Sequence, residues 1–165
     1  MNRRLTVLVL GLMFSAAAGC KSIGEPKRDF TLTVARLFLE TNDRSSASVE
    51  LPVSGVRVSI GAKPVITEGD IVAVDLVQVD LGKCLLFHLT PSAARDLYRL
   101  SGANQGRRLV LLLNQVAVGA RRIDAPLSEG RIFMFVEVAE KDLPTLAANL
   151  QKSVAELQAA IAKKK

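Results

Sequence analysis

The sequence predicts an α+β domain with a largely antiparallel β-sheet, one short helix and a longer C-terminal helix. Segments that alternate apolar and polar residues, as strands do, occur in pairs joined by short turns. Two segments with helical apolar spacing are placed among and after them. The resulting order, ββ, ββ, α, ββ, β, α, lacks the regular strand–helix alternation of a parallel sheet and indicates α+β.

Length and composition favour one globular domain. The chain has 165 residues, of which 49% are hydrophobic and 23% are charged. About 145 residues remain without a targeting segment, which is enough to bury a core. The net charge is +6, but the basic residues are scattered and no basic patch is interleaved with aromatic residues. We therefore expect no nucleic-acid partner.

Residues 1–19 have the pattern of a bacterial lipoprotein signal peptide. Two arginines precede an apolar run at 5–14, which is shorter than the roughly 20 residues that span a bilayer. Small residues then lead to a cysteine. This run resembles the lipobox of bacterial lipoproteins, with alanine where the family favours leucine at its first position: Ala17, Ala18, Gly19 and Cys20.

The resemblance implies cleavage before Cys20 and a covalent diacylglyceryl and acyl lipid (palmitate among the expected chains) on that residue. Two or three acyl chains give stable membrane anchoring. Lys21 follows where inner-membrane lipoproteins of enterobacteria carry Asp, so we expect a periplasm-facing protein of the outer membrane. An ordinary signal peptide, cut near Ala18 with an incidental Cys20, is the alternative. No other cofactor is expected.

Residues 20–29 are polar, contain Gly and Pro, and predict a lipidated tether. The single domain then spans 30–165. Alternation predicts a first strand over 30–39 and a loop over 41–48. Val49, Leu51 and Val53 begin a second strand, and residues 56–60 return after Ser54-Gly55 as a hairpin.

The central part of the chain predicts a second hairpin followed by the short helix. Strands are expected at 71–79 and 84–89, joined by a tight turn at 81–83. Thr90 is a suitable N-cap and Pro91 suits the first helical position. Gly102 is the expected stop of this helix.

A third hairpin and a last strand follow. Residues 109–113 form a continuous apolar run typical of a buried strand, and Asn114-Gln115 predicts the turn into 116–118. The last strand is expected over 131–139.

The longer helix is expected over 141–163. Its apolar residues repeat every three or four positions as a heptad stripe: Leu143, Ala147, Leu150, Val154, Leu157 and Ile161. At about 1.5 Å per residue this helix is longer than a small sheet needs. Either it packs on the sheet, or its second half overhangs and pairs with a partner helix.

Four runs between residues 65 and 136 resemble the periplasmic head subdomain of SecD, in the SecDF family. They are 65–71 (VITEGDI), 86–95 (LFHLTPSAAR), 104–114 (NQGRRLVLLLN) and 120–130 (ARRIDAPLSEG). The family's Asp-Gly turn is Asn114-Gln115 here, and its double glycine is Glu129-Gly130. The resemblance implies an envelope-facing fold that contacts other polypeptides. It does not carry over the motor activity of SecD, which depends on membrane helices.

Chemistry-bearing residues are few, and we expect no enzyme and no metal site. The one histidine, His88, lies in an apolar strand without a nucleophile-elbow pattern near Ser92 or Ser101. One histidine and one other cysteine, Cys84, cannot supply a zinc site. Cys84 itself is expected to be a buried, inert thiol.

Two basic pairs are the candidate partner contacts: Arg107, Arg108, Arg121 and Arg122. If they meet at one end of the sheet, they can bind an acidic segment or lipid headgroups; otherwise they are ordinary surface arginines. An edge strand, the loop 101–108 or the last helix are further contact candidates.

The sequence as a whole predicts a lipid-anchored, non-enzymatic protein-binding or scaffold module of the bacterial cell envelope. By resemblance alone, it would be accessory to protein export or envelope assembly, with another envelope protein as its partner. The alternative is a self-assembling structural lipoprotein, a homo-oligomer built through the last helix.

Overall fold

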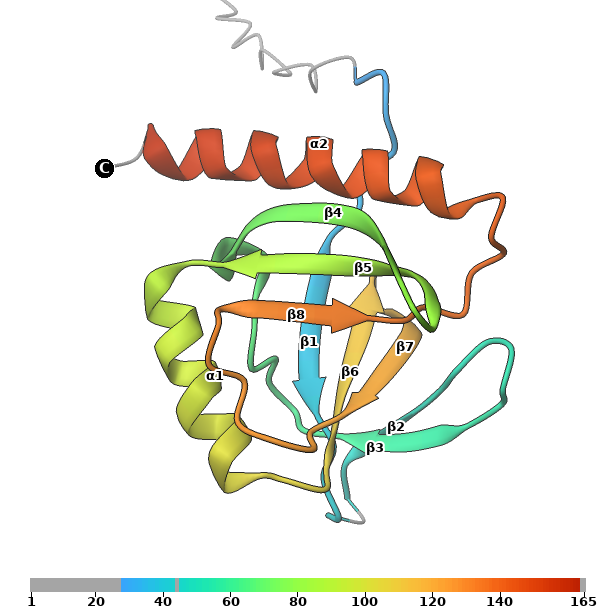
Figure 1. Ribbon diagram of the computed structural model, residues 1–165, viewed down its shortest axis with the longest axis vertical. Helices are drawn as coiled ribbons and strands as arrows, with labels where there is room; N and C mark the ends of the chain where they lie inside the picture. Colours follow the sequence, from blue (N-terminus) through green and yellow to red (C-terminus); the bar gives the residue numbers. More distant parts are fainter. Residues whose placement is uncertain (1–27, 44, 164–165) are drawn as a thin grey trace, which may run out of the picture.

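The computed structural model describes residues 28–43 and 45–163. The predicted signal peptide, its lipobox, Cys20 and most of the predicted tether lie outside the described residues. The described chain confirms the predicted α+β class, with antiparallel sheets and two α-helices (Figure 1).

The first sheet has three antiparallel strands in the order β1 (Ala35–Leu39), β6 (Arg108–Leu113) and β7 (Val116–Arg122). The prediction that the first strand begins at residue 30 is wrong. Thr33 and Val34 donate their backbone N–H groups to the side chains of Ser153 and Asn114, at 2.9 and 2.8 Å. Because these side chains accept the backbone N–H groups of the segment, the segment does not need a neighbouring strand to bond them.

The second sheet has the order β4 (Ile71–Val79), β5 (Gly82–Leu89) and β8 (Arg131–Met134). The predicted hairpin over 71–89 is confirmed, whereas the predicted extension of the last strand to Ala139 is wrong. After Met134 the chain leaves β5 and crosses to the other sheet, where the Glu137 N–H donates to the Val118 carbonyl at 2.6 Å. In Figure 1 the strands of the two sheets cross steeply.

Gly119 makes this crossing possible. A Cβ atom at position 119 would lie 2.3 Å from the carbonyl oxygen of Phe135. Only glycine therefore lets the chain after β8 approach β7 so closely.

A two-stranded hairpin, β2 (Ala47–Glu50) with β3 (Arg57–Ile60), confirms the predicted hairpin with shorter strands. Residues 51–54 form a turn instead of continuing β2. The hairpin and the outer face of the first sheet share a small apolar cluster: Leu51, Val58, Ile60, Val110, Leu112 and Ala117.

The short helix α1 (Pro91–Ala103) begins as predicted, because the Thr90 Oγ1 accepts the Ala93 N–H at 3.3 Å. It continues one residue beyond the predicted stop at Gly102. Asn104 then caps the helix, its N–H donating to the Ser101 carbonyl. A short 3-10 turn, η1 (Glu68–Asp70), precedes β4.

The longer helix α2 (Leu143–Ala162) lies along β4 and η1 (Figure 1). Of the heptad stripe, Leu143, Ala147, Leu150 and Val154 are buried. Gln158, near the helix end, donates its Nε2 to the carbonyls of Gly69 and Ile71. The interpretation of a helix packed on the sheet is thus confirmed, and α2 covers the β4 edge, which would otherwise be open to pairing.

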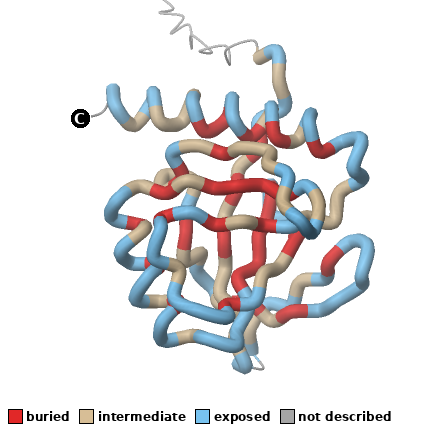
Figure 2. The backbone as a smooth tube through the Cα atoms, in the orientation of Figure 1, coloured by how far each residue is buried: buried red, intermediate tan, exposed pale blue. Residues whose placement is uncertain are grey.

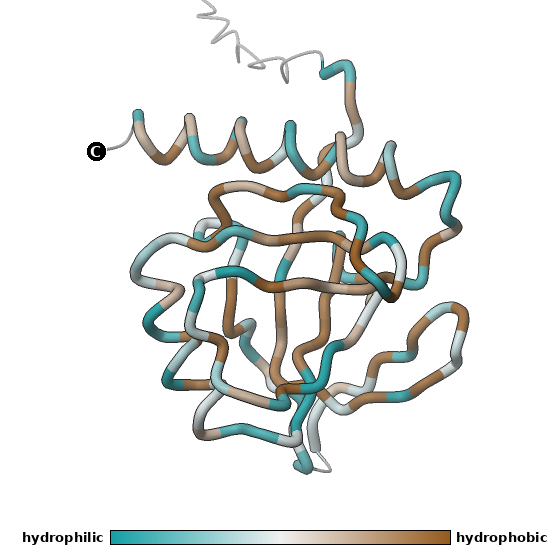
Figure 3. The backbone as a smooth tube through the Cα atoms, in the orientation of Figure 1, coloured by the Kyte–Doolittle hydropathy of each residue, from teal (hydrophilic) through white to brown (hydrophobic). Residues whose placement is uncertain are grey.

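One main core joins the two sheets and both helices. Its largest fully buried side chains include Leu37, Phe87, Leu97, Leu111 and Leu150. Buried positions concentrate on the strands and on the sheet-facing side of α2 (Figure 2), and most of these positions are hydrophobic (Figure 3).

Candidate protein-binding surfaces

The four candidate arginines come together at one end of the first sheet. Arg108 in β6 pairs in register with Arg122 in β7, and Leu109 pairs with Arg121. Arg107 directly precedes β6 and accepts the Ile123 N–H at its carbonyl, at 2.9 Å. The two basic pairs, whose meeting the sequence left open, thus lie side by side along the backbone, and we call this surface the arginine end.

Nearby acceptors balance part of the charge at the arginine end. Glu40 accepts hydrogen bonds from Arg108, at 2.8 Å from the backbone nitrogen and 3.4 Å from Nη1. Arg121 Nη1 donates to the Phe133 carbonyl at 3.2 Å, and Arg122 Nε lies 3.6 Å from the Asp124 carboxylate. Among the described residues, the four arginines thus have two carboxylate partners, Glu40 and Asp124, and the Arg121 side chain is directed toward β8 instead.

The arginine end lies at the far end of the sheet from the start of the described chain. Ala35, where the chain enters β1, pairs with Leu113, whereas Leu39 pairs with Leu109 beside the arginines. In Figure 1 the blue N-terminal segment runs beside α2, and the start of β6 and the end of β7 lie away from that helix. The fold therefore separates the tether side from the arginine end by the length of β1.

An apolar groove of about 240 Å³ lies on the tether side, between the N-terminal segment and α2. Its apolar lining comes from three distant parts of the chain: Leu32, Ala35, Ile71, Val154, Leu157 and Ala160. Two ion pairs flank it, Arg28 with Glu156 at 2.7 Å and Arg36 with Glu68 at 2.6 Å. Sequence reasoning missed this groove, since each lining residue by itself is typical of a core position.

The remaining chemistry-bearing residues do not converge on a site. His88 Nε2 lies 2.9 Å from the Asp75 Oδ2, on the neighbouring strand of the same sheet. Neither Ser92 nor Ser101 bonds this ring; the Ser101 hydroxyl donates to the Tyr98 carbonyl. Cys84 is fully buried, and burial raises the pKa of its thiol while the Arg121 charge acts in the opposite direction.

Within residues 28–43 and 45–163, no three His, Cys, Asp or Glu side chains are grouped so that they could hold a metal ion. In the same part of the chain, no helix is both long and apolar enough to cross a membrane.

The fold and these surfaces define a small α+β domain built from two crossing antiparallel sheets, with a helix along one sheet edge and a basic end opposite. Solved structures of SecDF have a similar fold. A SecDF chain in a super-membrane-facing form shares 14% sequence identity at a TM-score of 0.55, covering 74% of this chain and 18% of that one.

A second SecDF structure, of a membrane component that enhances protein export, gives the same identity, TM-score and coverage of this chain, and 61% of that chain is covered. The present chain thus spans less than two thirds of either SecDF chain. No family model and no curated protein matches it. The likeness shows a SecD-like fold, as the resemblance over 65–136 predicted, and extends over more of the chain than that segment.

Proposed function

We propose that this chain is a lipid-anchored, non-enzymatic protein-binding module of the bacterial cell envelope, accessory to protein export or envelope assembly. Lipid on Cys20 would fix it to a membrane, with the outer membrane favoured by Lys21. Its SecD-like fold supports the link to export, since the SecDF of known structure enhances protein export.

The observation that carries this proposal is the opposite placement of tether and arginine end. The described chain starts at Arg28, beside α2, and the arginines lie at the other end of β1. A chain anchored through Cys20 would therefore hold α2 near the membrane and present Arg107 and Arg122 away from it. The excess positive charge there would attract an acidic segment of a partner and speed its encounter.

The test is a crosslinked pull-down of the lipidated protein from its native envelope, with Cys20→Ser as the first comparison. The double variant Arg107→Glu/Arg122→Glu reverses charge at the arginine end. Arg99→Glu is the control, because Arg99 is an exposed arginine on α1 that lies 3.9 Å from the Asp96 carboxylate.

We expect specific recovery of translocon or envelope-assembly proteins that is lost with Cys20→Ser and with the double variant but kept with Arg99→Glu. Equal recovery with the double variant would place the contact elsewhere. Unchanged recovery with Cys20→Ser would contradict the role of the anchor.

Self-assembly through the last helix stays the alternative, but no observation in the described residues favours it. The heptad stripe that suggested it is largely buried against β4. Removing residues 152–165 would also remove the buried Ser153 and Val154. Recovery of only the protein itself in the pull-down would therefore be the better evidence for assembly.

A further inference from the structure

The polar side chains that line the apolar groove beside α2 already have hydrogen-bond partners. The Ser153 Oγ accepts the Thr33 N–H at 2.9 Å and donates to the Asn149 carbonyl at 2.7 Å. The Thr33 hydroxyl donates to the Thr31 carbonyl at 3.1 Å. In the part of the chain that the structure describes, no buried side-chain nitrogen or oxygen lacks such a partner. The side chains of the groove therefore favour a hydrocarbon over a polar ligand.

The charges that flank the groove are balanced in pairs. Arg28 donates to both carboxylate oxygens of Glu156 at 2.7 to 3.1 Å, although it has further interactions as well. Arg36 donates to both carboxylate oxygens of Glu68, at 2.6 and 2.7 Å. Because each guanidinium group has a carboxylate partner, the burial of apolar surface would hold an occupant, and charge would contribute little.

Apolar side chains of the groove are left open to solvent. Leu32 on one wall is 43% exposed, which is unusual for a large aliphatic side chain beside a core. On the α2 wall, Leu157 is half-buried and Ala160 is exposed. The groove volume of about 240 Å³ exceeds the roughly 150 Å³ of an apolar cavity that can hold benzene. A hydrocarbon chain would thus fit the groove and cover these side chains.

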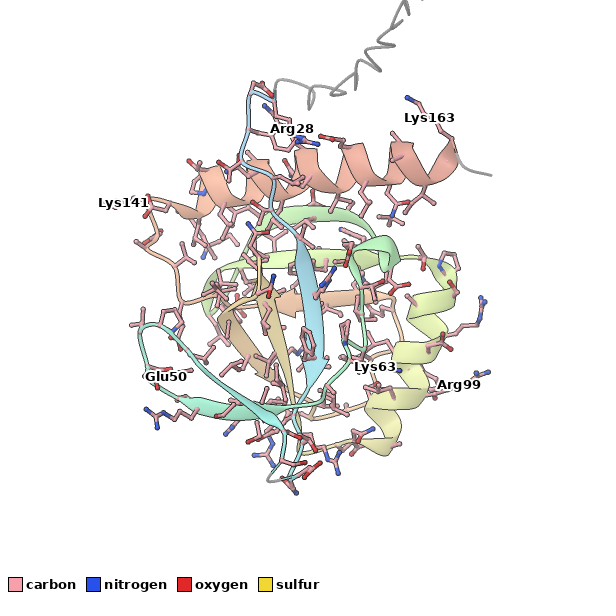
Figure 4. All side chains as sticks on the ribbon, turned by 180° about the vertical axis from the view of Figure 1, so that it is seen from behind. Arg28, Glu50, Lys63, Arg99, Lys141 and Lys163 are labelled. Atoms are coloured by element: carbon pink, nitrogen blue, oxygen red, sulfur yellow. The ribbon has the colours of Figure 1, made fainter. Side chains whose placement is uncertain are left out.

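The predicted lipid site lies within reach of the groove. Cys20 is eight residues before Arg28, so the connecting segment can span at most about 29 Å when fully extended. Arg28 itself lines the groove, and Figure 4 shows it beside α2, where the N-terminal segment reaches the helix. An acyl chain on Cys20 would belong to the same molecule as the groove, so its effective concentration there would be high.

We infer that the apolar groove takes one acyl chain of the lipid on Cys20. The inference rests on the lipid anchor of the proposed function. An acyl chain in the groove cannot lie in the bilayer at the same time, so occupation of the groove would weaken the attachment of the protein to the membrane. The fold would thereby regulate its own anchor.

Calorimetric titration tests the groove without the anchor. The protein is the chain from position 20 onward with Cys20→Ser, which contains every described residue. The ligands are dodecanoate and butanoate, which share a carboxylate and differ in the length of the hydrocarbon. Ala160→Trp and Leu32→Asp alter the two walls of the groove. Ala155→Trp is the matched control, because Ala155 is an exposed residue of α2 outside the lining, and circular dichroism confirms folding.

We expect dodecanoate to bind at one site, roughly tenfold or more weaker with Ala160→Trp and with Leu32→Asp, and little changed with Ala155→Trp. Butanoate should not bind. No binding of dodecanoate, butanoate binding as tight as that of dodecanoate, unchanged binding with both wall variants, or an equal loss with Ala155→Trp would overturn the inference.

Photocrosslinking of the full chain tests whether the acyl chain comes from Cys20. Cells are fed a palmitic acid that carries a diazirine and are irradiated before extraction, and mass spectrometry of peptides locates the crosslinks. We expect crosslinks that join Cys20 to residues 29–36 and 153–163, which line the groove from its two sides, and fewer of them with Ala160→Trp. Crosslinks from Cys20 to phospholipid alone would overturn the inference.

The mass of the purified full chain separates this inference from the proposed function. A lipidated chain without the crosslinks to the groove would overturn the inference and leave the proposed anchor in place. A chain without lipid on Cys20 would overturn both.

Discussion

Cys84 shows how burial controls chemistry at the scale of one residue. Its side chain has 0% exposed surface in β5, and burial raises the pKa of its thiol. Because the thiolate is the reactive form, we expect the folded Cys20→Ser protein to react with a thiol reagent roughly a hundredfold more slowly than in urea. With a thiol reagent that releases a chromophore when it reacts, absorbance measures the reaction rate of Cys84 in the folded protein and in urea. Similar rates in the two states would show that Cys84 is accessible in the folded protein.

Asn114 joins the turn of the third hairpin to the N-terminal segment. Its side chain accepts the Val34 N–H at 2.8 Å and donates to the Leu32 carbonyl at 3.1 Å. Replacing Asn114 with alanine removes both bonds, so we expect the free energy of unfolding to fall by about 1–2 kcal/mol. Urea denaturation followed by circular dichroism measures the change.

Gln115 provides the matched comparison at the same turn. Both turn residues have positive φ, 46° for Asn114 and 72° for Gln115, and glycine adopts this conformation without strain. Gln115→Gly should therefore raise the free energy of unfolding by about 0.5–1 kcal/mol. A loss of stability with Gln115→Gly would mean that the Gln115 side chain stabilises the fold by more than the positive φ destabilises it.

At the scale of elements, Glu137 holds the tip of the β2–β3 hairpin. Its Oε2 accepts the backbone N–H groups of Val53 and Ser54 at 2.7 and 2.8 Å. Hydrogen bonds from the Ser54 side chain and backbone, then from Val53, lower the pKa of the Glu137 carboxyl group. Because the pKa of Glu137 is lower in the folded state, its ionised carboxylate stabilises the folded protein. This stabilisation is complete above the unfolded-state pKa of about 4.3 and is lost as pH falls through the folded-state pKa.

We therefore expect Glu137→Gln to destabilise the protein most at neutral pH, with the difference from the parent shrinking as pH falls below about 4.3. Urea denaturation over a pH series measures it. Glu50→Gln on the same hairpin is the control, because Glu50 forms an ion pair with the exposed Arg57, and breaking such a pair should change stability little. A constant difference between parent and Glu137→Gln at all pH values would contradict the role of the charge.

Elements defined by short-range patterns could be predicted from the sequence. The strand over Ile71–Val79 and the start of α1 at Thr90-Pro91 depend on alternation and capping within a few residues. Element ends that depend on distant partners could not be predicted. The start of β1 is delayed by side chains from Asn114 and Ser153, and β8 ends early because the chain turns toward Val118.

The same distinction separates the two candidate surfaces. The sequence left open whether the two basic pairs meet, and they do because Arg108 and Arg122 belong to one hairpin, whose turn sets their register. The apolar groove beside α2 was not predicted at all, because Leu32, Ile71 and Leu157 meet only through the packing of the whole domain.

At the scale of the whole molecule, Gly119 joins the two sheets. A methyl group at position 119 would lie 2.3 Å from the Phe135 oxygen, a backbone atom that can move only with its strand. We expect Gly119→Ala to lower the free energy of unfolding by about 3 kcal/mol. Thermal and urea denaturation measure it.

Gly102→Ala is the control for the alanine substitution itself. Gly102 lies within α1, where the nearest atom that a Cβ would meet outside the backbone of its own helix is in the Pro126 side chain at 4.0 Å. Alanine favours helix over glycine by up to about 1 kcal/mol, so this variant should be more stable than the parent. Equal effects of the two substitutions would show that the sheet junction tolerates a side chain.

The position of α2 along the chain has a consequence for synthesis. The ribosome makes the β4–β5 hairpin, Ile71–Leu89, well before the helix that covers the β4 edge, which begins at Leu143. Until Leu143–Ala162 emerges, the nascent hairpin carries an unpaired edge that another strand could join. The β4 edge is therefore covered only after α2 has been made.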